Sequence, residues 1–179
     1  MWSGNGITGV ASGGVTGFMD KAVRDVVSSD VGGAFDLRVT LGSRRPLALD
    51  VSYLGNWANL RDPTGAAGGV LDGMTFEAAF RYNFNPGATW DPYAFVGLGW
   101  QHYEVRGATV DLMNAGMRSH DDLADAPLGA GLAFHRDGFV VDVRATLRVT
   151  QYNNLVRDTR TTYAAMDSWQ VGAGIGYEL

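Results

Sequence analysis

The alternation of residue types is clearest in segment 139–151, which reads FVVDVRATLRVTQ. From Phe139 on, one set of alternate positions is apolar and the other is polar or charged. The apolar set is Phe139, Val141, Val143, Ala145, Leu147 and Val149, and the polar set is Asp142, Arg144, Thr146, Arg148 and Thr150. Because successive side chains of a β-strand point to opposite faces, this segment predicts a strand with one apolar and one polar face.

The same alternation recurs along the whole chain. It predicts seven further strands, at 6–18, 31–42, 47–58, 73–84, 92–105, 123–135 and 166–179. Segment 6–18 is rich in glycine and has the weakest pattern, but it supplies the even number of strands that a closed antiparallel meander requires. In segment 92–105, Tyr93 and Phe95 fall on the face that also carries Gly97 and Gly99.

The connections between these segments alternate in length. The turns at 43–46, 85–91 and 136–138 are short, whereas 19–30, 59–72, 106–122 and 152–165 are longer, with about a dozen residues or more in each. Short turns on one side and long loops on the other are typical of outer-membrane barrels. The chain therefore predicts an all-β fold, a closed antiparallel up-and-down barrel of eight transmembrane strands that forms one domain over residues 1–179.

Composition excludes several classes of protein. No run approaches the roughly 18 apolar residues of a membrane helix, although 46% of the residues are hydrophobic. With no cysteine, a disulfide framework is excluded, and a net charge of -5 without a basic run excludes nucleic acid as a partner. Lys21 is the only lysine. The excess of arginine favours charges that are paired inside the protein. The chain starts without an export segment, so we expect that a signal peptide has been removed.

The polar faces of the strands decide between two kinds of barrel. A soluble lipocalin-like barrel would point its apolar face inward. Here the polar face is built from small residues with scattered charges, which suits a narrow interior in which each charge must be paired. We predict that hydrocarbon touches Phe35, Leu37, Val141 and Val143. The predicted polar interior comprises Asp36, Arg38, Asp50, Glu77, Arg81, Asp125, Asp142, Arg144, Arg148 and Glu178.

Aromatic residues gather near the ends of the predicted strands, as they do at the two interfaces of a membrane. Trp57, Trp100 and Trp169 are predicted to form a belt near the long connections. A second predicted belt, near the short turns, comprises Tyr82, Phe84, Trp90, Phe139 and Tyr177.

The segments PYAFVGLG at 92–99, APLGAGL at 126–132 and WQVGAGIGYEL at 169–179 resemble the small eight-stranded outer-membrane barrels of the OmpA/OmpX type. The resemblance covers nearly the whole chain. It implies a bacterial outer-membrane location in a Gram-negative cell envelope, periplasmic termini and extracellular long loops. It also implies contact with outer-membrane lipid and lipopolysaccharide, and recognition of the C-terminal strand by the barrel-assembly machinery. The chain ends in Leu179, where the family usually has phenylalanine, and we expect no peptidoglycan-binding domain after it.

No residue pattern points to catalysis, a metal or a cofactor. Lipid A deacylases and palmitoyltransferases resemble this chain in architecture only, because the deacylase pairing of His and Ser is missing around His102, His120 and His135. The segment 119–122 brings Ser, His and two Asp together, and Asp111, Asp121 and Asp122 could hold a cation. A solvated loop tip explains this cluster better, since triad members meet by folding rather than in sequence.

We therefore predict a non-enzymatic outer-membrane protein that anchors and displays its loops for surface contact or envelope integrity. The surface partner is not identified by the sequence. A narrow porin-like channel for small ions or solutes and a lipid-modifying enzyme are the alternatives.

Overall fold

A computed structural model describes residues 6–19, 31–61, 67–107, 120–151 and 167–179 of the 179-residue chain. These residues contain eight strands and no helix. The strands are β1 (Ile7–Phe18), β2 (Gly32–Leu41), β3 (Leu47–Arg61), β4 (Ala67–Asn83), β5 (Trp90–Arg106), β6 (His120–Arg136), β7 (Phe139–Gln151) and β8 (Ser168–Glu178). Within the described ranges, no helix long and apolar enough to cross a membrane is found.

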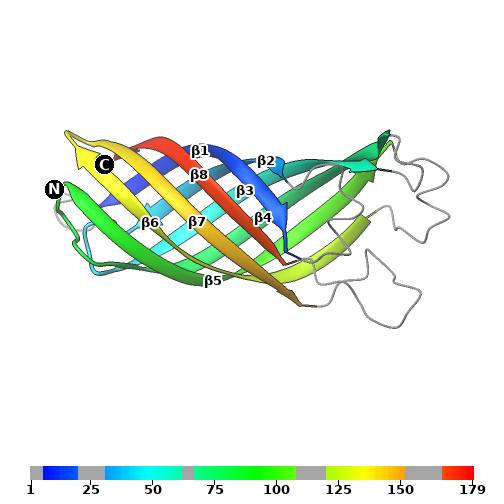
Figure 1. Cartoon of the computed structure of the whole chain (residues 1–179). Coiled ribbons are helices and arrows are strands. Elements are labelled where there is room, and N and C mark those ends of the chain that lie inside the picture. Colours follow the sequence, from blue (N-terminus) through cyan, green and yellow to red (C-terminus); the bar gives the residue numbers. More distant parts are fainter. Residues whose placement is uncertain (1–5, 20–30, 62–66, 108–119, 152–166) are drawn as a thin grey trace.

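The strands form one closed barrel in the order in which they occur in the chain. Each strand pairs antiparallel with its neighbours, and β1 closes the barrel against β8, with Thr8 opposite Glu178 and Phe18 opposite Ser168. The strands are tilted along the barrel, and β1 begins at the same end as the one where β8 ends (Figure 1). The predicted eight-stranded up-and-down barrel is confirmed, including its weakest strand, β1.

Two of the predicted connections are wrong. Residues 59–72 were expected to form a long loop, but β3 runs to Arg61 and β4 starts at Ala67. Residues 120–122 were also assigned to a loop, whereas His120 starts β6 and pairs with Glu104 of β5. The strands on this side of the barrel are longer because hydrogen bonding between neighbours continues past the point where the alternating apolar pattern stops.

Side-chain exposure confirms the predicted facing. Val141 and Val143 of β7 are 46% and 49% exposed, whereas Asp142 between them is 2% exposed. The same inversion holds on β2, where Leu37 is 51% exposed and Arg38 2%. The outer surface is an apolar band and the inner space holds the charges, so the lipocalin-like alternative is wrong for this chain.

Glycine on one strand makes room for an aromatic ring on the next. Tyr93 and Phe95 of β5 lie directly opposite Gly131 and Gly129 of β6, and all four residues face the interior. A Cβ at Gly131 would lie 2.4 Å from the Tyr93 ring, and one at Gly129 would lie 2.7 Å from the Phe95 ring. These two rings therefore occupy space that only glycine leaves free inside so narrow a barrel.

Candidate functional site: the charged interior

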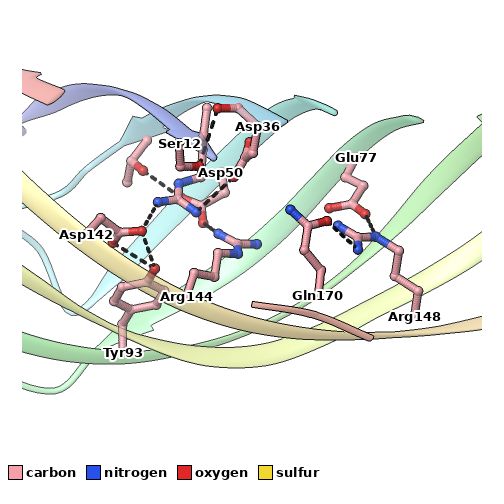
Figure 2. A network of polar contacts seen from close by, with 11 residues as sticks. Ser12, Asp36, Asp50, Glu77, Tyr93, Asp142, Arg144, Arg148 and Gln170 are labelled. Carbon is pink, nitrogen blue, oxygen red and sulfur yellow. Dashed lines mark hydrogen bonds and ion pairs between the residues drawn. The ribbon is translucent and has the colours of Figure 1, made fainter. Parts of the chain in front are cut away.

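The polar side chains inside the barrel form two clusters, which Figure 2 shows apart from each other along the barrel axis. The first cluster lies in the half nearer the short turns and is defined by Asp36, Arg38, Asp50, Tyr93, Asp142 and Arg144. The second lies toward the opposite end and is defined by Glu77, Gln101, Asp125, Arg148 and Gln170. Each member except Tyr93 and the two glutamines belongs to the predicted interior set.

Arg38 is at the centre of the first cluster. Its Nη2 donates to Asp142 Oδ1, and its Nη1 lies 3.5 Å from Asp36 Oδ2. The hydroxyl of Tyr93 donates to Asp142 Oδ2 over 2.8 Å. A guanidinium bound to two carboxylates from different strands ties β2 to β7 across the interior, since charge-assisted hydrogen bonds are the strong ones in a low-dielectric site.

Arg144 completes this cluster from β7. Its Nη1 donates to Asp50 Oδ2 over 2.8 Å, and Thr40 donates to the other oxygen of Asp50 over 2.7 Å. The guanidinium carbon of Arg144 lies 3.4 Å from the centre of the Phe95 ring. The ring thus covers a buried cation whose charge is also neutralised by a carboxylate.

The second cluster is organised by Arg148. Its Nε donates to Glu77 Oε1 over 2.5 Å, and its Nη1 donates to Gln170 Oε1 over 2.9 Å. Asp125 lies 3.9 Å from the same Nε and accepts a hydrogen bond of 3.0 Å from Gln101. All four partners come from different strands, so this cluster also cross-links the barrel wall.

Arg81 lies beside the first cluster, against Tyr93, and Glu178 lies apart from both clusters. The Nε of Arg81 donates to Asn83 over 2.6 Å, and its guanidinium lies 3.5 Å from the centre of the Tyr93 ring. Glu178 lies at the short-turn rim, where it accepts hydrogen bonds from Ser43 and Arg44 at 2.7 and 3.0 Å. Glu178 therefore fastens the end of β8 to the turn between β2 and β3.

Sequence reasoning missed the apolar side chains that close the interior toward the long connections. Phe18, Leu71, Tyr103 and Leu123 are all buried there, and the rings of Phe18 and Tyr103 lie 6.4 Å apart. Leu71 was not predicted to face the interior, because the sequence analysis assigned it to a loop. The alternation in β5 could have placed Tyr103 in the interior, because Tyr103 lies on the same face of the strand as Gln101.

The predicted aromatic belts all come from outward positions. Trp57, Trp100, Tyr82, Phe84, Trp90, Phe139 and Tyr177 are exposed, and Trp169 is half-buried. On the short-turn side they pair, with Phe139 and Tyr177 5.7 Å apart. Two rings also cover glycines of the neighbouring strand: Trp57 lies over Gly33 and Phe35 over Gly55. The belts therefore also cover bare backbone on the outer surface.

Tyr53 and Phe76 extend the aromatic belt near the long connections, although the sequence analysis placed neither residue in it. Their ring centres lie 4.9 Å apart, and Phe76 stacks on Trp100 at 6.3 Å. The three residues stand opposite one another on β3, β4 and β5. Their alignment depends on strand register, which the individual segments do not reveal.

Of the cluster at 119–122, the structure describes only the side chain of Asp122. The Nδ1 of His102 lies 2.9 Å from Asp122 Oδ1 on the outer surface. Ser119 and Asp111 lie outside the described residues, and within those residues no group of three His, Asp or Glu that could hold a metal ion is found. His135 lies at the other end, 3.5 Å from Glu178.

No protein-family model matches the sequence, and no curated protein matches it. Solved structures do match. The N-terminal β-barrel domain of Pseudomonas aeruginosa OprF is 15% identical with a TM-score of 0.57, and the match covers 98% of each chain. Neisserial surface protein A is 11% identical, with a TM-score of 0.63 and 97% of each chain covered. The attachment invasion locus protein Ail of Yersinia pestis is 13% identical, with a TM-score of 0.59, 98% of this chain and 100% of that chain covered.

The chain has the fold of the small eight-stranded outer-membrane barrels. The resemblance seen in the sequence is thereby confirmed at the level of fold. Identities this low show architecture alone, so the roles of the matched proteins are not transferred.

Proposed function

We propose that this chain is a non-enzymatic bacterial outer-membrane barrel that anchors and displays its long connecting segments at the cell surface, for surface contact or envelope integrity. The observation that carries the proposal is the reversal of burial in the barrel, with aliphatic side chains outside and paired charges inside, as on β2, β3 and β7. Only a hydrocarbon solvent makes such an outer surface favourable, because large exposed apolar bands do not persist in water.

The matched structures support this location. Neisserial surface protein A is a surface protein by description, and Ail is described as an outer membrane protein with a structure in a phospholipid bilayer nanodisc. Ail was crystallised with the heparin analogue sucrose octasulfate, which gives a precedent for a loop-bearing barrel of this fold that binds an anionic ligand. For the present chain, contact with lipopolysaccharide and recognition of β8 by the barrel-assembly machinery belong to the proposal.

Refolding in detergent tests the proposal most directly. A closed membrane barrel should float with phospholipid vesicles in a density gradient and should migrate differently on a gel before and after boiling. A chain that stays soluble without detergent and does not float would overturn the membrane assignment. Incubation with lipopolysaccharide followed by mass spectrometry tests the non-enzymatic part, for which no change in lipid A mass is expected.

The narrow channel is the second candidate, and the interior argues against it. Arg38, Arg144 and Arg148 each bind carboxylates from other strands, and the apolar group around Tyr103 fills the far end. An eight-stranded barrel is just wide enough for such side chains to fill it. The clusters are therefore proposed to stabilise the barrel rather than to conduct ions.

A further inference from the structure

An open apolar groove runs along the outer face of β1, between β2 and β8. The part at the short-turn end has a volume of about 680 Å³. It is lined by Ile7, Leu41, Leu47, Leu179 and Arg45 together with Gly6 and Gly42. The part further from the short turns has a volume of about 500 Å³. Its walls are formed by Leu37 and Val39 of β2 and by Ile175 and Tyr177 of β8. Gly9 and Ala11 of β1 form its floor.

The two parts of this groove follow one another along the same three strands. On β1 the outward residue after Ile7 is Gly9, and on β2 the outward residue before Leu41 is Val39. On β8, Tyr177 likewise precedes Leu179, whose N–H donates to the carbonyl of Ile7 over 2.8 Å. Successive outward positions on three neighbouring strands therefore pass from one part into the other, and β1 is seen between β2 and β8 in Figure 1.

The glycine on the floor has no reason to be glycine within the chain itself. A Cβ at Gly9 would meet no atom within 4 Å, which is also true of Gly13 further along β1, and neither residue has a positive φ. Gly33 and Gly55, which also face outward, are each covered by an aromatic ring of the same chain. Glycine weakens a strand unless something approaches its backbone closely. The uncovered floor thus fits an external ligand.

The floor spans part of one leaflet of a membrane. From Ile7 to Ala11 the strand rises about 13 Å, at about 3.3 Å per residue. With a tilt of roughly 40°, that is about 10 Å along the bilayer normal, or about a third of a hydrocarbon core of about 30 Å. The groove therefore extends from the short-turn rim into the leaflet on that side.

A cation stands at the rim end of the groove. Arg45 is exposed, and in the part of the chain that the structure describes its guanidinium forms no ion pair. The neighbouring Arg44 is different, because it binds Glu178. An unpaired guanidinium beside an apolar groove is complementary to a ligand with an anionic head and an apolar tail, and guanidinium binds phosphate oxygens well.

We propose that this groove binds one glycerophospholipid of the leaflet on the short-turn side, with its phosphate on Arg45 and one acyl chain over Gly9 and Ala11. The inference rests on the proposed membrane placement. Leu37, Val39, Ile175 and Tyr177 contact the chain from the sides. The bound lipid fills the only strand face on which outward glycines stand uncovered among the described residues.

Native mass spectrometry of the detergent-refolded barrel with dioleoylphosphatidylglycerol tests this site. We expect one lipid to be retained by the wild type. Gly9→Leu should weaken retention about tenfold by filling the floor, and its side chain points into open space, so the strand is expected to fold. Arg45→Gln should weaken retention about fivefold for this lipid and leave dioleoylglycerol, which lacks the phosphate, unchanged.

Two controls match these variants. Ala78→Leu places the same side chain at an outward position on β4, and Arg136→Gln removes an exposed short-turn arginine that does not line the groove. Both should retain the lipid like the wild type. The proposal is overturned by equal retention in Gly9→Leu, by an equal loss in Ala78→Leu, or by dioleoylglycerol that binds as well as the phospholipid. A wild-type dimer that Gly9→Leu dissociates would assign the groove to a second copy instead.

The membrane placement is tested separately, by vesicle flotation of the same variants. Failure of the wild type to float would overturn the proposed function. A barrel that floats but retains no phospholipid would overturn the groove alone.

Discussion

Arg38 on β2 and Asp142 on β7 form an ion pair across the barrel interior, although 104 residues separate them in the sequence. Both side chains are almost completely buried, and Asp142 also accepts a hydrogen bond from Tyr93. The pair links β2 and β7, which are not neighbours in the sheet. The ion pair therefore cross-links the barrel through its interior, in addition to the hydrogen bonds between neighbouring strands.

Breaking this ion pair should destabilise the barrel strongly. Arg38→Met leaves the Asp142 carboxylate buried with Tyr93 as its remaining partner, and a cost of about 3–5 kcal/mol is expected. The triple variant Arg38→Met/Asp36→Asn/Asp142→Asn should recover most of this loss, because neither carboxylate that Arg38 binds is then left buried without its cation. Urea unfolding of the refolded barrel, followed by tryptophan fluorescence, measures both. Equal stability of Arg38→Met and of the exposed-site control Arg136→Gln would contradict a structural role for the pair.

A charge placed on the outer band should report the surrounding solvent. Val143→Arg is expected to cost about 2–4 kcal/mol in a bilayer, whereas Leu179→Arg at the rim should cost about 0–1 kcal/mol. Unfolding titrations in phospholipid vesicles measure the difference. If Val143→Arg were neutral and made the chain soluble without detergent, the outer band would not face lipid.

Two glycines that lie close to each other across β1 and β8 should respond differently to alanine. A Cβ at Gly174 would lie 2.4 Å from the Cβ of Ser12 and 2.5 Å from the carbonyl oxygen of Ala11, so Gly174→Ala should cost about 1–3 kcal/mol. Gly13→Ala, with nothing within 4 Å, should stay within about 0.5 kcal/mol of the wild type. The temperature at which each variant starts to migrate on a gel like the boiled protein ranks the stability of the two variants. The reverse order would refute the packing argument.

The filled interior should not conduct. In planar bilayers the wild-type barrel is expected to give no resolved current steps, because both charged clusters and the apolar group around Tyr103 occupy the space. Conductance steps in the wild type whose size shifts in Asp142→Asn would support the channel instead. Steps that are unaffected by interior variants would point to leaks around the barrel.

The absence of cysteine from the sequence permits a clean test of orientation. Asp137→Cys lies in the short turn between β6 and β7, and Glu104→Cys lies on an exposed position near the opposite end of β5. In intact cells, a maleimide that cannot cross the outer membrane should label Cys at 104 and leave Cys at 137 unlabelled until the cells are lysed. The opposite labelling would place the short turns outside.

Much of the fold could be predicted because its signals are local. Alternation in segments such as 139–151 depends only on the two-residue period of a strand, so each strand and its facing follow from its own residues. Sequence also assigned Asp142 and Arg144 to the interior. It misjudged residues 59–72 and 120–122, where strands continue by pairing with a neighbour after their own apolar pattern has ended.

The sequence by itself determined the number of strands, their antiparallel order, and the inward or outward facing of most residues in the alternating segments. Only the tertiary structure decided which charges pair, that Arg148 binds Glu77 while Arg81 binds Asn83, and that Gly9 is left uncovered while Gly33 lies under Trp57. The physical reason is register. Alternation fixes the face on which a residue stands, but a partner on another strand depends on how far the strands slide past one another when the sheet closes.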